Sequence, residues 1–163
     1  MTGEQGELLG PGAAGHGFPV LPDWVEDPAQ RVDLQMPARP ELWRVARMTV
    51  SAIGALLSFD VEQIADLRMA VDELLAVCAR GAADDAVLSI ATCWDETRVL
   101  VSCVASPVSV VDHALVDEAE AVLLPPGLNP SELAERILEA LADSYSIEEP
   151  ENGVRRGWLC KTR

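Results

Sequence analysis

The sequence is poor in basic residues and has no long apolar run. Only 12 Lys and Arg stand against 27 Asp and Glu, which gives a formal net charge of −15 at pH 7. A surface this negative repels the phosphates of nucleic acids and anionic lipids, so we expect neither as a partner. The N-terminal stretch lacks a basic segment followed by an apolar one, and no later stretch carries ~20 apolar residues without a charge, a proline or a turn. We therefore expect no signal peptide, no membrane anchor and a cytoplasmic location.

Residues that could ligate a metal or serve as a nucleophile with its base are also scarce. The four cysteines form no C-x-x-C pair, and each lies in an apolar-patterned segment: Cys78, Cys93, Cys103 and Cys160. The two histidines, His16 and His113, lie in a Gly-rich stretch and in an acidic one. This pattern favours buried thiols over metal ligands or disulfides, and it gives no Cys–His or Ser–His–Asp arrangement.

What the sequence does contain is apolar side chains, which make up 49% of the residues. Together with the charge, they indicate a folded body with an acidic surface. Such a surface attracts basic surfaces of other proteins, which favours a protein partner. Composition alone supports a simpler reading equally well, namely that the acidity serves only solubility.

The chain length suits one domain with one core. Residues 1–30 are rich in Gly and Pro and have no periodicity, which is typical of a disordered leader. The folded domain is expected over residues 31–163. It begins with RVDLQMP, whose alternation of apolar and polar residues predicts a half-buried strand that ends at Pro37.

Two helices are predicted next. The first starts at Pro40 and continues through Leu56, with an expected buried stripe of Leu42, Val45, Thr49, Ile53 and Leu56. The second is capped by Asp60, with Gln63 completing a capping box, and it ends near Gly81. Its expected core stripe is Ile64, Leu67, Val71, Leu74 and Cys78.

The remaining segments predict two hairpins and a third helix. AVLSIATCW and RVLVSCVAS form a hairpin through Asp95-Glu96-Thr97, and an irregular acidic segment follows Pro107. Asn129 caps the third helix in a capping box with Glu132, and Leu133, Ile137 and Leu141 face one side of it. The last hairpin turns at Pro150-Glu151-Asn152-Gly153. We predict an α/β (α+β) fold, a two-layer sandwich of helices on a mostly antiparallel sheet.

One carboxylate in the second helix invites a functional hypothesis. Asp66, Ala70, Glu73 and Val77 lie in one row beside the core stripe. A partly buried Glu73 would have a raised pKa and could act as a general base. The alternative is a boundary carboxylate that is solvated or paired with Arg80, and the residues alone favour this second reading.

The segment DLRMAVDELLAV resembles the N-box of the anti-sigma factor serine kinases of the RsbW and SpoIIAB type, in the GHKL (Bergerat-fold) ATPase superfamily. The order of the predicted elements from Arg31 to Arg163 is similar to that family's fold, which resembles the ATPase domain of histidine kinases. The resemblance implies that Glu73 is the activating base. It also implies that Val77 occupies the position of an Asn that ligates Mg²⁺, and an aliphatic side chain cannot ligate this cation.

The family's adenine-recognition motif D-x-G-x-G corresponds to a run that starts at Ala105, which contains neither the carboxylate nor a glycine. The Gly-rich lid is replaced by a loop that carries Asp112, Asp117, Glu118 and Glu120. The resemblance therefore implies a degenerate nucleotide site, with no cofactor expected, and ATP with Mg²⁺ only if the protein is an active kinase.

The resemblance also implies partners. It suggests a sigma factor, an anti-anti-sigma factor and a homodimer, and it places a partner-binding arginine at Arg47, although a solvated helix arginine explains that residue equally well.

The first hypothesis is an anti-sigma regulator that sequesters a sigma factor with little or no ATP binding, so that the chain is not an enzyme. The second is an active protein serine kinase that phosphorylates the anti-anti-sigma partner. The third is an adaptor that binds only an anti-anti-sigma-like domain.

Overall fold

The computed structural model describes residues 30–83, 85–106, 129–148 and 155–163. The predicted leader, the irregular acidic segment after Pro107 and the turn of the last hairpin lie outside these residues. Within the described part of the chain, no helix combines the length and the apolar character needed to cross a bilayer.

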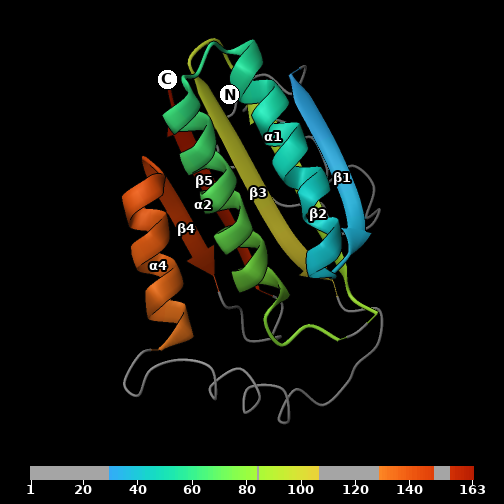
Figure 1. The fold of residues 1–163 in the computed structure, drawn as a ribbon. Coiled ribbons are helices and arrows are strands. Elements are labelled where there is room, and N and C mark those ends of the chain that lie inside the picture. The colour runs from blue at the N-terminus through green and yellow to red at the C-terminus, as the bar shows by residue number, and fades with distance from the viewer. Residues whose placement is uncertain (1–29, 84, 107–128, 149–154) are drawn as a thin grey trace, which may run out of the picture.

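Five strands form one antiparallel sheet in the order β1-β2-β3-β5-β4 (Figure 1). The strands are β1 (Arg31–Pro37), β2 (Val87–Trp94), β3 (Arg98–Ser106), β4 (Ser144–Glu148) and β5 (Arg156–Thr162). The predicted strands and the two hairpin pairings are confirmed. The turn between β2 and β3 is held by Asp95, whose carboxylate accepts hydrogen bonds from the backbone N–H groups of Thr97 and Arg98.

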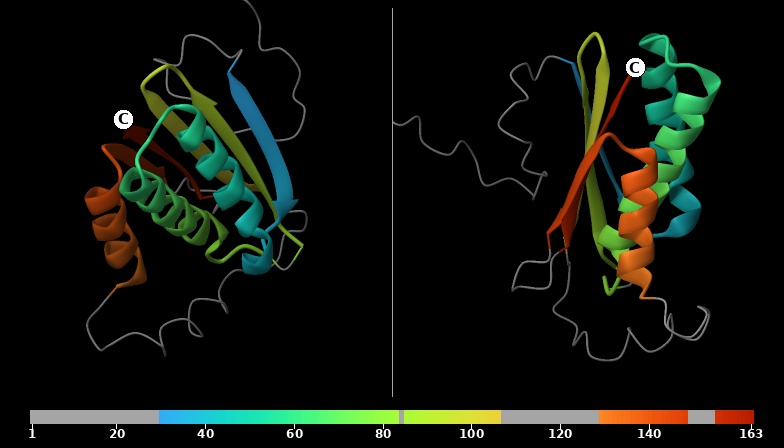
Figure 2. Two further views of the ribbon diagram at one scale, coloured as in Figure 1. Left: turned by 45° about the horizontal axis from the view of Figure 1, so that its top comes forward. Right: turned by 90° about the vertical axis from the view of Figure 1, so that its left-hand side faces the viewer.

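Among the described residues, three α-helices are present, and they cover one face of this sheet in the edge-on view of Figure 2. They are α1 (Arg44–Leu56), α2 (Val61–Ala79) and α4 (Pro130–Leu141), and a short 3₁₀ turn, η1 (Pro40–Leu42), precedes α1. The predicted two-layer α/β sandwich is therefore confirmed. The ATPase-like version of this fold stays a prediction.

Helix α2 lies at the centre of the core and matches its predicted pattern. Asp60 and Gln63 form the predicted capping box, in which the Gln63 N–H donates to Asp60 Oδ1 and the Asp60 N–H donates to Gln63 Oε1. The predicted stripe faces the sheet, with Leu67, Val71 and Leu74 completely buried. The chain leaves the helix through Gly81, whose φ of +70° is one that glycine adopts without steric cost.

The buried stripe predicted for helix α1 is largely wrong. Ile53 is buried, but Val45 is 42% exposed and Leu56 is 70% exposed. The face that packs on the core instead carries Ala46, Val50, Ile53 and Gly54. Small residues allow close packing here, since a Cβ on Gly54 would lie 3.3 Å from Ile64 Cγ1. Apolar residues occur on several sides of α1, so periodicity alone did not identify the buried one.

Helix α4 also differs in detail from its prediction. Asn129 caps it as expected, but its side chain accepts a hydrogen bond from the Ser131 N–H, and no capping box with Glu132 forms. Its buried residues are Ala134 and Leu138, whereas Leu133 and Ile137 are only partly buried. Leu141 packs against the core as predicted.

All four cysteines are buried free thiols, as predicted. Cys78 of α2 donates through Sγ to the carbonyl oxygen of Cys103 in β3, at 3.5 Å. Burial raises the pKa of the Cys103 thiol well above its usual value, so this thiol stays neutral. The residues serve as small apolar side chains of the core.

Candidate functional site

The predicted row on α2 is mostly packed rather than open. Ala70 and Val77 are buried, and only Asp66 and Glu73 keep partial contact with solvent. The Asp66 carboxylate accepts a hydrogen bond from Lys161 Nζ of β5 at 3.1 Å. Lys161 also donates to the carbonyl oxygen of Leu141, at 2.7 Å, so this lysine connects the sheet with α2 and α4. Asp66 therefore has a structural role.

Glu73 is the one carboxylate of this row without a partner among the described residues. No ion pair or hydrogen bond joins Glu73 to Arg80, whose guanidinium donates from Nη1 to Ser131 Oγ at 2.9 Å. Partial burial raises the pKa of Glu73, the neighbouring Asp72 raises it further, and the charge of Arg80 opposes both. A carboxylate with a raised pKa holds a proton more readily, which suits a general base.

The two positions that the sequence analysis assigns to a degenerate nucleotide site are both aliphatic and buried. Val77 lies one helical turn after Glu73 and is 3% exposed. Ala105 lies near the end of β3 with its side chain on the core, and its N–H donates to the carbonyl oxygen of Arg155 at 3.3 Å. Strand β3 packs against α2, so the fold brings these positions to neighbouring elements. Neither side chain offers an oxygen to Mg²⁺ or to adenine.

A metal site is not found elsewhere in the described part of the chain. No group of three His, Cys, Asp or Glu side chains there is arranged to hold an ion. Val77, at the position where the family resemblance predicts an Asn ligand, therefore gives Glu73 no oxygen-bearing companion for a metal ion.

Arg47 belongs to a different surface, on the outer side of the helices. Its guanidinium crosses to α2 and donates from Nη1 to Asp72 Oδ1 at 2.7 Å, and both side chains are about one-third exposed. Since Asp72 is the residue before Glu73, the ion pair connects α1 to the segment that carries the candidate base. Exposed ion pairs of this kind contribute little to stability, typically below ~1 kcal/mol.

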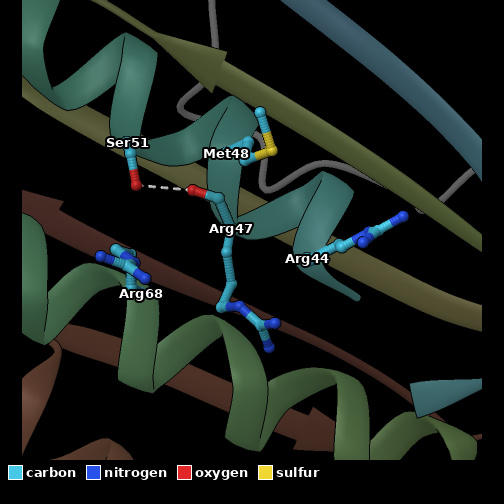
Figure 3. Close-up of a pocket in the computed structure, with 5 residues that line it drawn as sticks. All are labelled: Arg44, Arg47, Met48, Ser51 and Arg68. Atoms are coloured by element: carbon cyan, nitrogen blue, oxygen red, sulfur yellow. Dashed lines mark hydrogen bonds between the residues drawn. The ribbon is translucent and has the colours of Figure 1, made fainter. Parts of the chain in front are cut away.

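Arg47 also lines an open pocket of about 350 Å³ between α1 and α2 (Figure 3). The other lining residues are Arg44, Met48 and Ser51 of α1 and Arg68 of α2. Ser51 is held in place by donating through Oγ to the carbonyl oxygen of Arg47, at 2.6 Å. Three guanidinium groups thus line one pocket of a protein whose net charge is −15.

The sequence analysis missed Arg44 and Arg68 as site residues. The spacing of Arg44 and Arg47 places both on one side of α1, a signal that the sequence does contain. The contribution of Arg68 depends on how α2 packs against α1, and no local pattern predicts that packing.

Comparison with known proteins gives a partial match. No protein-family model matches the chain. The chain is 36% identical over 75 residues to the anti-sigma-F factor RsbW of Mycobacterium tuberculosis, in strain CDC 1551 / Oshkosh and in strain ATCC 25618 / H37Rv. The match covers 46% of this chain and 45% of the relative, so the chain spans less than half the length of the curated relatives it matches. Over that segment, the chain is similar to an anti-sigma factor.

Proposed function

We propose that the chain is an anti-sigma regulatory protein, which binds and sequesters a sigma factor and is released by an anti-anti-sigma partner. The observation that carries the proposal is the 36% identity to the anti-sigma-F factor RsbW. The order of elements, which resembles the family's fold, supports it independently of that identity.

The proposed activity needs little or no ATP. The buried Val77 and Ala105 support this part of the proposal, because the two positions that would bind the cation and the base offer only carbon atoms. In this account Glu73 is a vestige of a catalytic base, which the surrounding fold still leaves partly buried.

Arg47 is the proposed partner-binding residue. It is partly exposed on the outer side of α1, away from the sheet, where a protein partner can reach it. The acidic remainder of the surface suits a partner with basic regions, and such long-range attraction speeds encounter and weakens with salt.

A homodimer is proposed through the sheet face that the described helices leave open (Figure 2). On that face Cys93, Leu100 and Cys160 form a small apolar cluster with Trp158; these three residues are at most 5% exposed, so the proposal does not rest on their exposure. Sedimentation equilibrium of the full chain tests this point, since a monomer across the micromolar range would refute it.

The proposed function is tested by capture from the native cell. The tagged full-length chain should recover a sigma factor, and adding a purified anti-anti-sigma protein should release it. Recovery of an anti-anti-sigma-like protein without any sigma factor would instead support an adaptor and overturn the proposal.

A second candidate function, a protein serine kinase, is favoured by the raised pKa of Glu73. It requires that other ligands hold the metal. A Glu73→Ala variant separates the two candidates, because it should abolish phosphate transfer to an anti-anti-sigma protein if the chain is a kinase. Under the first proposal no transfer occurs in either protein, and sigma-factor binding is nearly unchanged by the substitution.

A further inference from the structure

The sheet face opposite the three described helices is buried, although none of those helices packs on it (Figure 2). Cys93 of β2, Leu100 of β3 and Cys160 of β5 lie on this face and are at most 5% exposed. Three further residues share the face by the alternation of side chains along a strand, and they are at most 2% exposed: Ser89, Ala91 and Ser102. These six residues form the sheet patch.

The neighbouring strands do not account for the burial of the sheet patch. Side chains stand roughly perpendicular to a sheet, so neighbours shield their flanks and leave their ends open to water. Among the described residues, Trp158 of β5 packs against the apolar part of the patch. Ser89 and Ala91 of β2 lie two strands away from β5 and are buried all the same. The patch therefore needs a further cover that spans β2, β3 and β5.

Residues 18–25 of the leader have the composition of such a cover. They read FPVLPDWV, in which every residue other than Asp23 and the two prolines is an apolar one that can bury a large side chain. The prolines disfavour a helix or an internal strand, so these side chains need an existing apolar surface on which an extended chain can dock. In this respect the segment differs from the Gly-rich residues before it.

The start of β1 brings the leader to the sheet patch. The Trp94 N–H donates to the carbonyl oxygen of Gln30 at 3.1 Å, and Arg31 is opposite Cys93 in the register of β1 and β2. The leader thus joins the sheet beside Cys93. An extended chain spans about 3.3 Å per residue, or roughly 40 Å for residues 18–29, whereas neighbouring strands lie about 4.8 Å apart. The segment is long enough to cross all three central strands.

The segment at residues 107–128 suits this place less well. It follows Ser106 at the far end of β3 and must return to Asn129, which caps α4 in the helix layer on the other side of the sheet. It also carries four carboxylates, whose burial against an apolar cluster would be unfavourable. The leader is the occupant that connectivity and composition favour.

We propose that residues 18–25 dock on the sheet patch of their own chain. Phe18, Leu21 and Trp24 supply the apolar area that covers the patch around Leu100. The inference does not rest on the proposed anti-sigma function. It bears on the proposed homodimer, because a second copy that uses the same sheet face has to displace the leader first.

Thiol labelling of the full-length chain tests the contact, because the four cysteines divide between the two sides of the sheet. Cys93 and Cys160 are the patch thiols, whereas Cys78 and Cys103 are the core thiols beneath the helices. Burial raises the pKa of both patch thiols, which keeps them neutral and slow to react. If the leader is the cover, its release should make the patch thiols reactive and leave the core thiols protected.

A Leu21→Asp/Trp24→Asp variant releases the leader. At a protein concentration too low for dimers, N-ethylmaleimide should modify its patch thiols about tenfold faster or more than those of the parent, because local exposure controls the rate. A Leu8→Asp/Leu9→Asp variant is the matched control, since it adds the same two charges to the leader outside the docking segment. Its patch thiols should react within about twofold of the parent rate.

Photo-crosslinking locates the segment in a chain that keeps its apolar residues, so it decides the question even if the two Asp substitutions perturb the fold. Benzoylphenylalanine in place of Phe18 of the full-length chain should crosslink to peptides of β2, β3 or β5. A mixture of isotope-labelled and unlabelled chains distinguishes crosslinks within one chain from those between two chains. The proposal predicts crosslinks within one chain.

Unchanged labelling rates of the patch thiols in the Leu21→Asp/Trp24→Asp variant would overturn the proposal. Crosslinks from position 18 only to the helices, only to residues 107–128 or only between chains would also overturn it. Sedimentation equilibrium adds the link to the dimer: where the homodimer forms, the variant should associate about tenfold more tightly than the parent, because no leader has to be displaced. If parent and variant are both monomeric, the proposed homodimer is refuted and the docking of the leader stands.

Discussion

At the scale of single residues, Glu73 is the carboxylate whose ionisation the fold opposes most clearly. Its pKa is raised above the usual value of 4.5 by burial and by the charge of Asp72. The folded state therefore holds the Glu73 proton to a higher pH than the unfolded state does. Below both pKa values the two states are equally protonated. As the pH rises above the unfolded-state value of 4.5 the stability begins to fall, and the loss is complete above the raised folded-state pKa.

A Glu73→Gln variant should consequently be more stable than the parent at neutral pH. The gain should shrink as the pH falls through the raised pKa and should vanish below the unfolded-state value of 4.5. Urea unfolding of both proteins across this pH range measures it. A matched Glu135→Gln variant, on the exposed side of α4, should show little change at any pH. A gain that persisted in acid would show that charge is not the cause.

Lys161 is the residue that joins the sheet to two helices. Its side chain is 12% exposed and donates both to Asp66 and to the carbonyl oxygen of Leu141. A Lys161→Met change removes the hydrogen-bond donor of both the Asp66 carboxylate and the Leu141 carbonyl oxygen. The loss should lower the free energy of unfolding by roughly 1–3 kcal/mol. Chemical unfolding tests this, together with Asp66→Asn and the double variant. Strictly additive effects of the two substitutions would mean that no ion pair operates in solution.

At the scale of elements, the turn from α1 to α2 contains a residue with a strained backbone conformation that one substitution could relieve. Ser58 has a φ of +60°, the N–H of Phe59 donates to the carbonyl oxygen of Gly54, and the N–H of Ser58 donates to that of Ala55. These two bonds are those of a Schellman motif, whose left-handed residue is usually glycine.

Ser58→Gly should therefore stabilise the protein by about 0.5–1 kcal/mol, because the loss of left-handed strain exceeds the added freedom of the unfolded chain. Thermal unfolding should show a higher midpoint for this variant. A Ser51→Gly variant is the matched control, since Ser51 lies inside α1 and glycine should destabilise the helix there by roughly 0.5 kcal/mol. A lower midpoint for Ser58→Gly would contradict the assignment of the motif.

The same helices show how far the sequence predicts the fold. Helix α2 was predicted correctly because a stripe of five apolar residues, from Ile64 to Cys78, recurs at spacings of three and four, and because its first turn has a complete capping box, although Val61 and Met69 of the same helix are exposed. Helix α1 carries apolar residues on several faces, so the helix was predicted but its buried face was not. Packing against Ile64 and Phe59 selects the face with Ala46 and Gly54. That selection depends on tertiary contacts, which periodicity does not contain.

Some residues of the candidate site were likewise predictable from the sequence, and others were not. Glu73, Val77 and Ala105 were identified from the segment that resembles the N-box and from the position of the following strand, both of which are local in sequence. The arginine-lined pocket depends on contacts such as Arg47 with Asp72, which are 25 residues apart. The sequence therefore predicts an altered nucleotide site, whereas the pocket that joins Arg44 with Arg68 emerges only from the packed helices.

At the scale of the whole molecule, the charge distribution follows two patterns. The net charge of −15 attracts basic surfaces over distances up to about the Debye length, ~10 Å at 0.1 M salt. The arginine-lined pocket is a local exception, where three guanidinium groups lie together and one of them, that of Arg47, pairs with Asp72. A sigma factor that binds with both kinds of surface would be steered by the first pattern and oriented by the second.

The central claim is that the chain holds a sigma factor without help from a nucleotide. The most direct test is calorimetric titration of the purified full-length chain with the sigma factor recovered from the native cell, performed with and without Mg-ATP. The account predicts a complex with the same Kd in both conditions and no heat from Mg-ATP alone. A complex that forms only with Mg-ATP, or micromolar Mg²⁺-dependent binding of ATP itself, would contradict it.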